Sequence, residues 1–195
     1  MEIAKGITSD QYNALDLSDY TKPDWDKAFE FLNRRLIDRY IEPADVLEAA
    51  EKDKSASEKK YGFTILAIDC FLIETIQSFY EGETDSQHKS QRLFKNFLTQ
   101  RDNFKEHFKT EAEAGHFYIN FRCGILHQAQ TFGNTKVWAV GQMVMTQGKY
   151  LIVNRERFHQ AVKAEKDIYL ELLKKRSDIK LLEHFKTKMD FIATA

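Results

Sequence analysis

Cysteine, proline and glycine are all scarce in this chain, which has 2, 2 and 8 of them among 195 residues. With only Cys70 and Cys123, each within an apolar stretch, a disulfide framework is not expected, and the composition fits a reducing compartment, the cytoplasm. The shortage of proline and glycine favours long uninterrupted helices. The length suits one domain with a substantial core.

Long apolar runs and a strong net charge are also lacking. The longest purely apolar runs are only a few residues, too short to span a bilayer, and the first residues do not resemble a secretion signal. The net charge of −1 is unlike that of a highly basic nucleic-acid-binding chain. Residues 155–195 nevertheless carry 10 basic and 7 acidic side chains. These cations form either a solvated helix surface or a surface that follows RNA phosphates: Lys163, Lys166, Lys174, Lys175 and Arg176.

Apolar residues recur at spacings of three and four over most of the chain, which is the period of helices with one buried side. The first twenty residues are polar and mixed, and we expect them to be irregular. Pro43 is expected to end the first helix, because proline breaks a helix interior. A charged connector over residues 52–60 then leads to the most apolar helix. The pattern predicts helices over residues 24–40, 44–51, 61–80, 86–100, 110–130, 155–175 and 179–192.

Two short runs rich in β-branched and aromatic residues interrupt the helical period, at 136–140 and 149–154. Gln147-Gly148 lies just before the second run and favours a turn. We therefore predict a β-hairpin insertion over residues 133–154. The whole chain, 1–195, is predicted to be one mostly α domain, a compact helical bundle with this late insertion.

Within the helix expected over 110–130, Arg122 and His127 lie five residues apart in otherwise apolar surroundings. A buried ionisable side chain is costly unless it is paired or used. On an ideal α-helix the two side chains would point about 140° apart and lie about 7.5 Å apart along the axis. They meet only if the arginine reaches round, if Gly124 relaxes the helix, or if a second copy contributes its own pair. We expect the third arrangement, a homodimer.

An arginine and a histidine together suit metal-free cleavage of RNA. The guanidinium of Arg122 would hold the phosphate and stabilise its charge, and His127 would take or give a proton near neutral pH. The attacking group would be the 2′-hydroxyl, which only RNA has. On spacing alone, a satisfied core histidine and an arginine at the helix edge are the simpler explanation of the pair, because chance pairs at this spacing are common.

Other polar side chains extend this candidate site. His116, Asn120 and Cys123 fall on the same stripe as His127 on an ideal helix, and we expect them to contact substrate. Two acids of the apolar helix, Asp69 and Glu74, are either surface residues or part of the same polar site. The four remaining histidines lie in charged segments and are expected to be solvated: His88, His107, His159 and His184.

Two other chemistries remain open at this position. Cys123 and His127 have a spacing that zinc ligands use, but His116 would lie about 16 Å from His127, too far to share one ion. Cys123 with His127 as its base would be a nucleophile, whereas a buried structural thiol needs no such partner. No metal or other cofactor is expected.

The segment Phe121-Arg-Cys-Gly-Ile-Leu-His-Gln resembles the motif helix of the HEPN superfamily, an arginine followed after four to six residues by a histidine. The common form of that motif, Arg-Asn-Gly-Leu-Leu-His, is matched here by Arg122, Gly124, Leu126 and His127. The resemblance implies a HEPN-like helical fold and a dimeric, metal-independent endoribonuclease, a hydrolase of toxin–antitoxin or phage-defence systems. It makes Arg122 and His127 the catalytic pair.

The resemblance also implies partners: RNA, a second copy of the chain, and an antitoxin or regulatory protein. One position departs from the family, which has Asn, Asp or His directly after the arginine where this chain has Cys123. A thiol is a weaker hydrogen-bonding group than those side chains. The alternative function is therefore a non-catalytic HEPN module that acts as a dimer in RNA binding or protein interaction.

Overall fold

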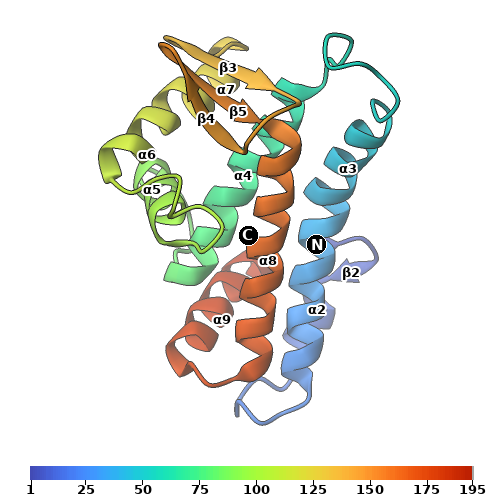
Figure 1. Ribbon diagram of the computed structural model, residues 1–195. Coiled ribbons are helices and arrows are strands. Elements are labelled where there is room, and N and C mark those ends of the chain that lie inside the picture. The colour runs from blue at the N-terminus through green and yellow to red at the C-terminus, as the bar shows by residue number, and fades with distance from the viewer. Residues whose placement is uncertain (195) are drawn as a thin grey trace.

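A computed structural model, which describes residues 1–194, shows a compact and mostly α-helical fold, as predicted. The long apolar helix α4 (Gly62–Glu81) lies at its centre and packs against α8 (Arg155–Lys175), α5 (Ser90–Gln100) and α9 (Ile179–Thr194). Figure 1 shows α4 and α8 side by side, with the short strands at one end of both helices. Helices α5, α8 and α9 thus pack around the apolar helix α4.

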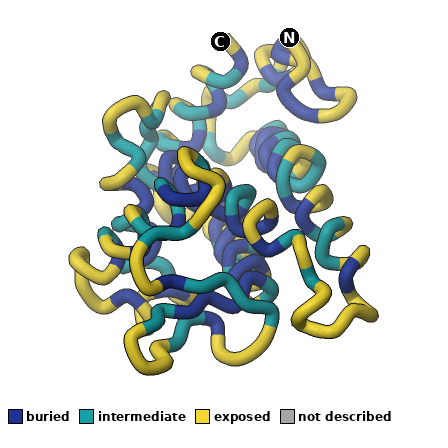
Figure 2. The backbone as a smooth tube through the Cα atoms, turned by 90° about the horizontal axis from the view of Figure 1, so that it is seen from above, coloured by how far each residue is buried: buried dark blue, intermediate teal, exposed yellow. Residues whose placement is uncertain are grey.

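Helix α4 is long and apolar enough to cross a membrane by length and composition alone. Two thirds of its most apolar window is buried inside the protein, however, as expected of a core helix. Figure 2 shows buried backbone along the helices of the interior and exposed backbone mainly in the connecting segments. The apolar character of α4 is therefore explained by packing within the protein.

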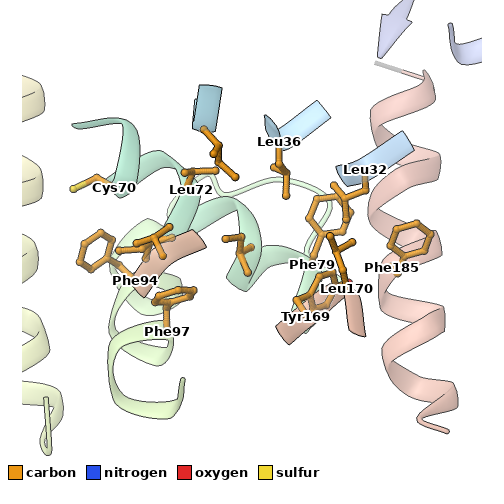
Figure 3. Packing of buried hydrophobic residues seen from close by; sticks show 14 of the residues in the cluster. Leu32, Leu36, Cys70, Leu72, Phe79, Phe94, Phe97, Tyr169, Leu170 and Phe185 are labelled. Carbon is orange, nitrogen blue, oxygen red and sulfur yellow. The ribbon is translucent and has the colours of Figure 1, made fainter. Parts of the chain in front are cut away.

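Aromatic rings fill the centre of the bundle. Phe79 of α4 contacts Tyr169 of α8 and Phe185 of α9, with ring centroids 6.2 Å and 6.1 Å apart, and all three rings are almost fully buried. Figure 3 shows these rings together with Leu32 of the first long helix, so four helices meet in one cluster. Burying so much aromatic surface is the main source of stability in a fold of this kind.

The first long helical segment does not end at Pro43, contrary to the prediction. Helix α2 (Asp24–Leu36) runs through a π-helical turn, η1 (Ile37–Ile41), into α3 (Glu42–Ala49). Pro43 lies in the first turn of α3. Pro43 directly follows the π-helical turn, where the hydrogen-bond register changes, and the helical segment continues although proline has no N–H group to donate.

The first twenty residues are more ordered than predicted. Strands β1 (Glu2–Ala4) and β2 (Ile7–Thr8) form a small antiparallel pair, and helix α1 (Ser9–Asn13) follows. Thr8 and Gln11 form a reciprocal capping box at the start of α1. Ile3, Ala4, Ile7 and Tyr12 of this segment are buried in the core cluster, and this packing orders a segment whose composition is mostly polar.

The predicted hairpin exists, but one of its strands was assigned wrongly. Strands β4 (Val144–Gln147) and β5 (Tyr150–Asn154) pair antiparallel across the turn at Gly148. Strand β3 (Thr135–Trp138), which was expected to be the hairpin partner, instead pairs parallel to β5. The insertion is therefore a three-stranded sheet in the order β3-β5-β4. Strand β4 was not predicted, because its polar and exposed end does not show the residue pattern of a strand.

Candidate functional site

Arg122 and His127 lie on one helical segment, as predicted, but this segment is not a regular α-helix. Helix α6 (Glu111–Phe117) leads into a π-helical turn, η2 (Tyr118–Cys123), and then into α7 (Gly124–Gln128). A π-helix joins residues five apart, which is the spacing of the pair, and such turns are frequent at functional sites. Local geometry therefore differs here from the ideal helix used in the sequence argument.

Within one chain, Nη1 of Arg122 lies 3.3 Å from Nε2 of His127. On an ideal helix the two side chains would point about 140° apart, yet they meet within one copy of the chain. The favoured route to the contact, through a second copy, is therefore wrong, whereas the homodimer itself stays a prediction. One copy of the chain already contains a paired guanidinium and imidazole.

This contact places a guanidinium beside an imidazole nitrogen. Nη1 of Arg122 can donate to Nε2 of His127 when that nitrogen carries no proton, because a guanidinium only donates hydrogen bonds. His127 is also exposed to solvent. The imidazole therefore lies at the surface, beside a permanent positive charge.

Glu74 of α4 holds the arginine in place. Nε of Arg122 donates to Oε1 of Glu74 at 2.6 Å, and both side chains are largely buried. Burial alone would lower the pKa of Arg122, but the hydrogen bond and the charge of Glu74 outweigh it and raise the pKa. The ring of Tyr118 lies 5.3 Å from the guanidinium, and burial raises the pKa of this tyrosine to about 12. The guanidinium is thus permanently charged and keeps its terminal nitrogens available.

The segment after α7 folds back onto the π-helical turn and fixes the position of His127. The N–H of Phe132 donates to the carbonyl oxygen of Asn120 at 2.9 Å, and the N–H of Gln130 donates to that of Gly124 at 3.3 Å. A Cβ atom on Gly124 would lie 2.5 Å from the Gln130 carbonyl oxygen. Only glycine therefore permits this close return of the chain, which gives a structural reason for the glycine inside the motif.

The predicted substrate-contacting residues do not all gather at this pair. The side chain of Asn120 donates to the His116 carbonyl oxygen at 2.9 Å, so its amide is used within the helix. His116 lines a different cavity, of about 690 Å³, between α6 and the sheet. Cys123 is half-buried beside the hydroxyl of Tyr118. Of His116, Asn120 and Cys123, only Cys123 directly follows Arg122 in the sequence. Tyr118 is a neighbour of both Cys123 and Arg122.

Asp69, the remaining predicted contact, belongs to a separate and buried ion cluster. It is fully buried on α4, and its Oδ1 lies 2.6 Å from Nδ1 of His159 on α8. Nε2 of His159 lies 3.3 Å from Oδ1 of Asp45 on α3, and this carboxylate also accepts from Lys163. A carboxylate without exposed surface cannot contact RNA, so the prediction for Asp69 was wrong.

His159 was predicted to be solvated, and it is completely buried instead. Burial alone would lower the pKa of His159, but Asp69, Glu48 and Asp45 outweigh it and raise the pKa above its ordinary value of 6.5. Burial also raises the pKa of Asp69. The cluster therefore holds its protons more tightly in the folded protein than in the unfolded chain, which makes stability depend on pH.

We expect the free energy of unfolding of the wild type to decrease, relative to a His159→Gln variant, as the pH rises from about 6 to about 8. A group with a raised folded pKa stabilises fully below its unfolded pKa of about 6.5, and that contribution is lost as the pH rises through the folded pKa. Urea unfolding at several pH values measures the difference, and a difference that stays constant with pH would contradict the assignment.

The basic residues of the last two helices are mostly engaged within the protein. Lys163 binds Asp45, Lys174 binds Glu171, and Lys166 is buried and binds Asp167 and Asn33. Arg176 likewise pairs with Asp26. Paired cations attract phosphates less than free ones, so the structure favours the plain structural interpretation of this surface.

Among residues 1–194, no group of three His, Cys, Asp or Glu side chains is arranged to hold a metal ion. The zinc arrangement considered for Cys123 and His127 therefore has no third protein ligand in the described part of the chain. Comparisons of the chain with protein-family models, with curated proteins and with solved structures each found no match. The functional argument accordingly rests on the residues and their geometry.

Proposed function

We propose that this protein is a metal-independent endoribonuclease of the HEPN type, and that Arg122 and His127 form its catalytic pair. The observation that carries the proposal is the 3.3 Å contact between the guanidinium and an exposed imidazole. A fixed cation beside a group that can take a proton is the combination that phosphate transfer to a 2′-oxygen requires.

The reaction would proceed through the ribose itself. The 2′-oxygen attacks the adjacent phosphorus, its proton passes to Nε2 of His127, and the bond from phosphorus to the 5′-oxygen breaks. The terminal nitrogens of Arg122 stabilise the negative charge that develops on the phosphate oxygens. The 5′-oxygen leaves with a proton from solvent or from a second histidine, and the other product ends in a 2′,3′-cyclic phosphate. Glu74 is a positioning residue in this scheme, because it contacts the arginine and not the reacting atoms.

The setting of this activity is part of the proposal. We infer a cytoplasmic enzyme that acts as a homodimer, with an antitoxin or regulatory protein that restrains it in a toxin–antitoxin or phage-defence system. In a dimer, the His127 of a second copy would be a natural source of the proton for the leaving oxygen. Exposed Ile119, on the same π-helical turn as Arg122, offers apolar surface for such a contact.

We expect the purified protein to cleave single-stranded RNA in the presence of EDTA and to leave products that end in a 2′,3′-cyclic phosphate. The same oligonucleotide with 2′-O-methyl groups should stay intact, because its 2′-oxygen has no proton to give to His127. Gel analysis of end-labelled RNA and mass spectrometry of the products measure both outcomes.

Three results would change the assignment. Cleavage that disappears in EDTA would favour a metal-dependent reaction. Cleavage of the methylated RNA would exclude attack by the 2′-oxygen. Binding of RNA without any cleavage would favour the second candidate, a non-catalytic HEPN module, for which Cys123 in place of a stronger hydrogen-bonding residue is the supporting observation.

A further inference from the structure

A small cavity adjoins the candidate site where α4, the segment that follows it and α9 meet. Its volume is about 110 Å³, and Glu74 and Lys188 lie in its wall. Glu74 is the carboxylate that accepts the hydrogen bond from Arg122. Glu74 therefore connects the cavity to Arg122, although neither Arg122 nor His127 lines the cavity itself.

Lys188 of α9 gives this cavity an ammonium group. Its Nζ donates to the Thr84 carbonyl oxygen at 2.6 Å, and among residues 1–194 no carboxylate lies within ion-pair distance of it. The neighbouring acid Glu83 forms ion pairs with Lys89 and Arg92. Asp85 interacts with Lys188 only through its charge, without an ion pair. Burial lowers the pKa of Lys188. Glu74, the carboxylate in the same wall, is already paired with Arg122. An anion that enters the cavity is therefore stabilised by the partly desolvated ammonium of Lys188, which has no counter-ion of its own.

Exposed aromatic rings accompany this ammonium. Phe71 forms part of the cavity wall and is 44% exposed, although large apolar side chains in this fold are mostly buried. Phe191, which is 40% exposed, has its ring centroid 5.8 Å from Nζ of Lys188. A cation with exposed rings beside it is typical of surfaces that bind single-stranded nucleic acid, where the rings stack on bases.

The size of the cavity limits what it can hold. A volume of about 110 Å³ equals the share of only a few water molecules in the liquid, at about 30 Å³ each. A phosphate group fits such a space, whereas a nucleobase with its ribose does not. The base of a bound nucleotide would therefore lie outside the cavity, where the rings of Phe71 and Phe191 are exposed.

We propose that Lys188 and Phe71 form a subsite for the nucleotide next to the cleaved bond, with the Lys188 ammonium on the neighbouring phosphate and the Phe71 ring stacked on its base. The subsite rests on the proposed ribonuclease function and extends it, because it makes single-stranded RNA the bound form. A duplex keeps its bases stacked on one another and leaves none for Phe71.

The test measures binding of a short single-stranded RNA with 2′-O-methyl groups, which cannot react, by fluorescence anisotropy. We expect Lys188→Gln and Phe71→Ala each to weaken binding about five- to tenfold. Lys188→Arg should restore most of the affinity, because it keeps the charge. Lys180→Gln, an exposed lysine on the same helix, is the matched control and should change binding less than twofold. Thermal unfolding of each variant checks that it is folded.

The outcomes separate the subsite from the catalytic proposal. If the wild type cleaves unmodified RNA but Lys188→Gln binds as Lys180→Gln does, the subsite is wrong and the ribonuclease stands. If the wild type neither binds nor cleaves RNA, the ribonuclease proposal fails first, and the subsite with it. If Phe71→Ala lowers the molecular mass in light scattering along with the affinity, this surface is an interface between two copies, and the stacking role is wrong.

Discussion

Replacing Arg122 or His127 with alanine is expected to reduce RNA cleavage by about two to four orders of magnitude. Loss of a group that stabilises developing charge costs about 10²–10³-fold in rate, and loss of a general base costs about 10²–10⁴-fold. The double variant should be little slower than the His127→Ala variant, because residues that act on one transition state are not additive. Initial rates on a fluorescent oligonucleotide, with EDTA present, measure all three.

Matched substitutions elsewhere on the surface control this experiment. His116→Ala removes an exposed histidine from the same helical segment, but His116 lines the separate cavity between α6 and the sheet. Arg157→Ala removes an exposed arginine of α8. Both variants should keep wild-type rates within about twofold. If either alanine variant of the proposed pair also keeps such a rate, the assignment of the catalytic residues is refuted.

The second large effect concerns stability, at the buried ion pair between Glu51 and Arg155. Their side chains are only 1% and 4% exposed. Glu51 follows α3, Arg155 begins α8, and the carboxylate also accepts from the backbone N–H groups of Lys60 and Tyr61 just before α4. One carboxylate thus joins three helices. Glu51→Ala should lower the free energy of unfolding by about 3–5 kcal/mol, because it leaves the arginine buried without its counter-ion.

Urea unfolding measures this loss, and two further variants define its cause. Glu171→Ala removes an acid from an exposed pair with Lys174 and should cost less than about 0.5 kcal/mol. Replacing both Glu51 and Arg155 with apolar residues of similar size should recover part of the loss, because no unpaired charge then remains. A Glu51→Ala variant as stable as Glu171→Ala would show that the pair does not hold the three helices together.

The sequence predicted the helices well where their apolar period is regular. Helix α8 begins and ends at the residues that the pattern indicated, 155 and 175. The period fails at residues 37–41 and 118–123, because both are π-helical turns and the periodicity argument assumes 3.6 residues per turn. Pro43 led to the wrong end for the first helical segment, and the second turn lies in the segment that brings Arg122 to His127.

Ion pairs between residues far apart in the sequence could not be predicted either. Arg122 and Glu74 are 48 residues apart, and His159 and Asp69 are 90 apart, so no local pattern connects either pair. One signal did exist: two acids interrupt the most apolar helix of the chain, where an unpaired carboxylate would be costly. It was compatible with surface positions as well as with a polar site for Asp69 and Glu74, and only the packing of α4 against α8 and η2 shows that both acids have partners.

The contact between Arg122 and His127 would have a consequence for timing in the proposed reaction. With Nη1 of Arg122 on Nε2 of His127, the nitrogen that would accept the 2′ proton is covered until a phosphate draws the guanidinium away. The proposed base would then become free only when the phosphodiester on which it acts is bound.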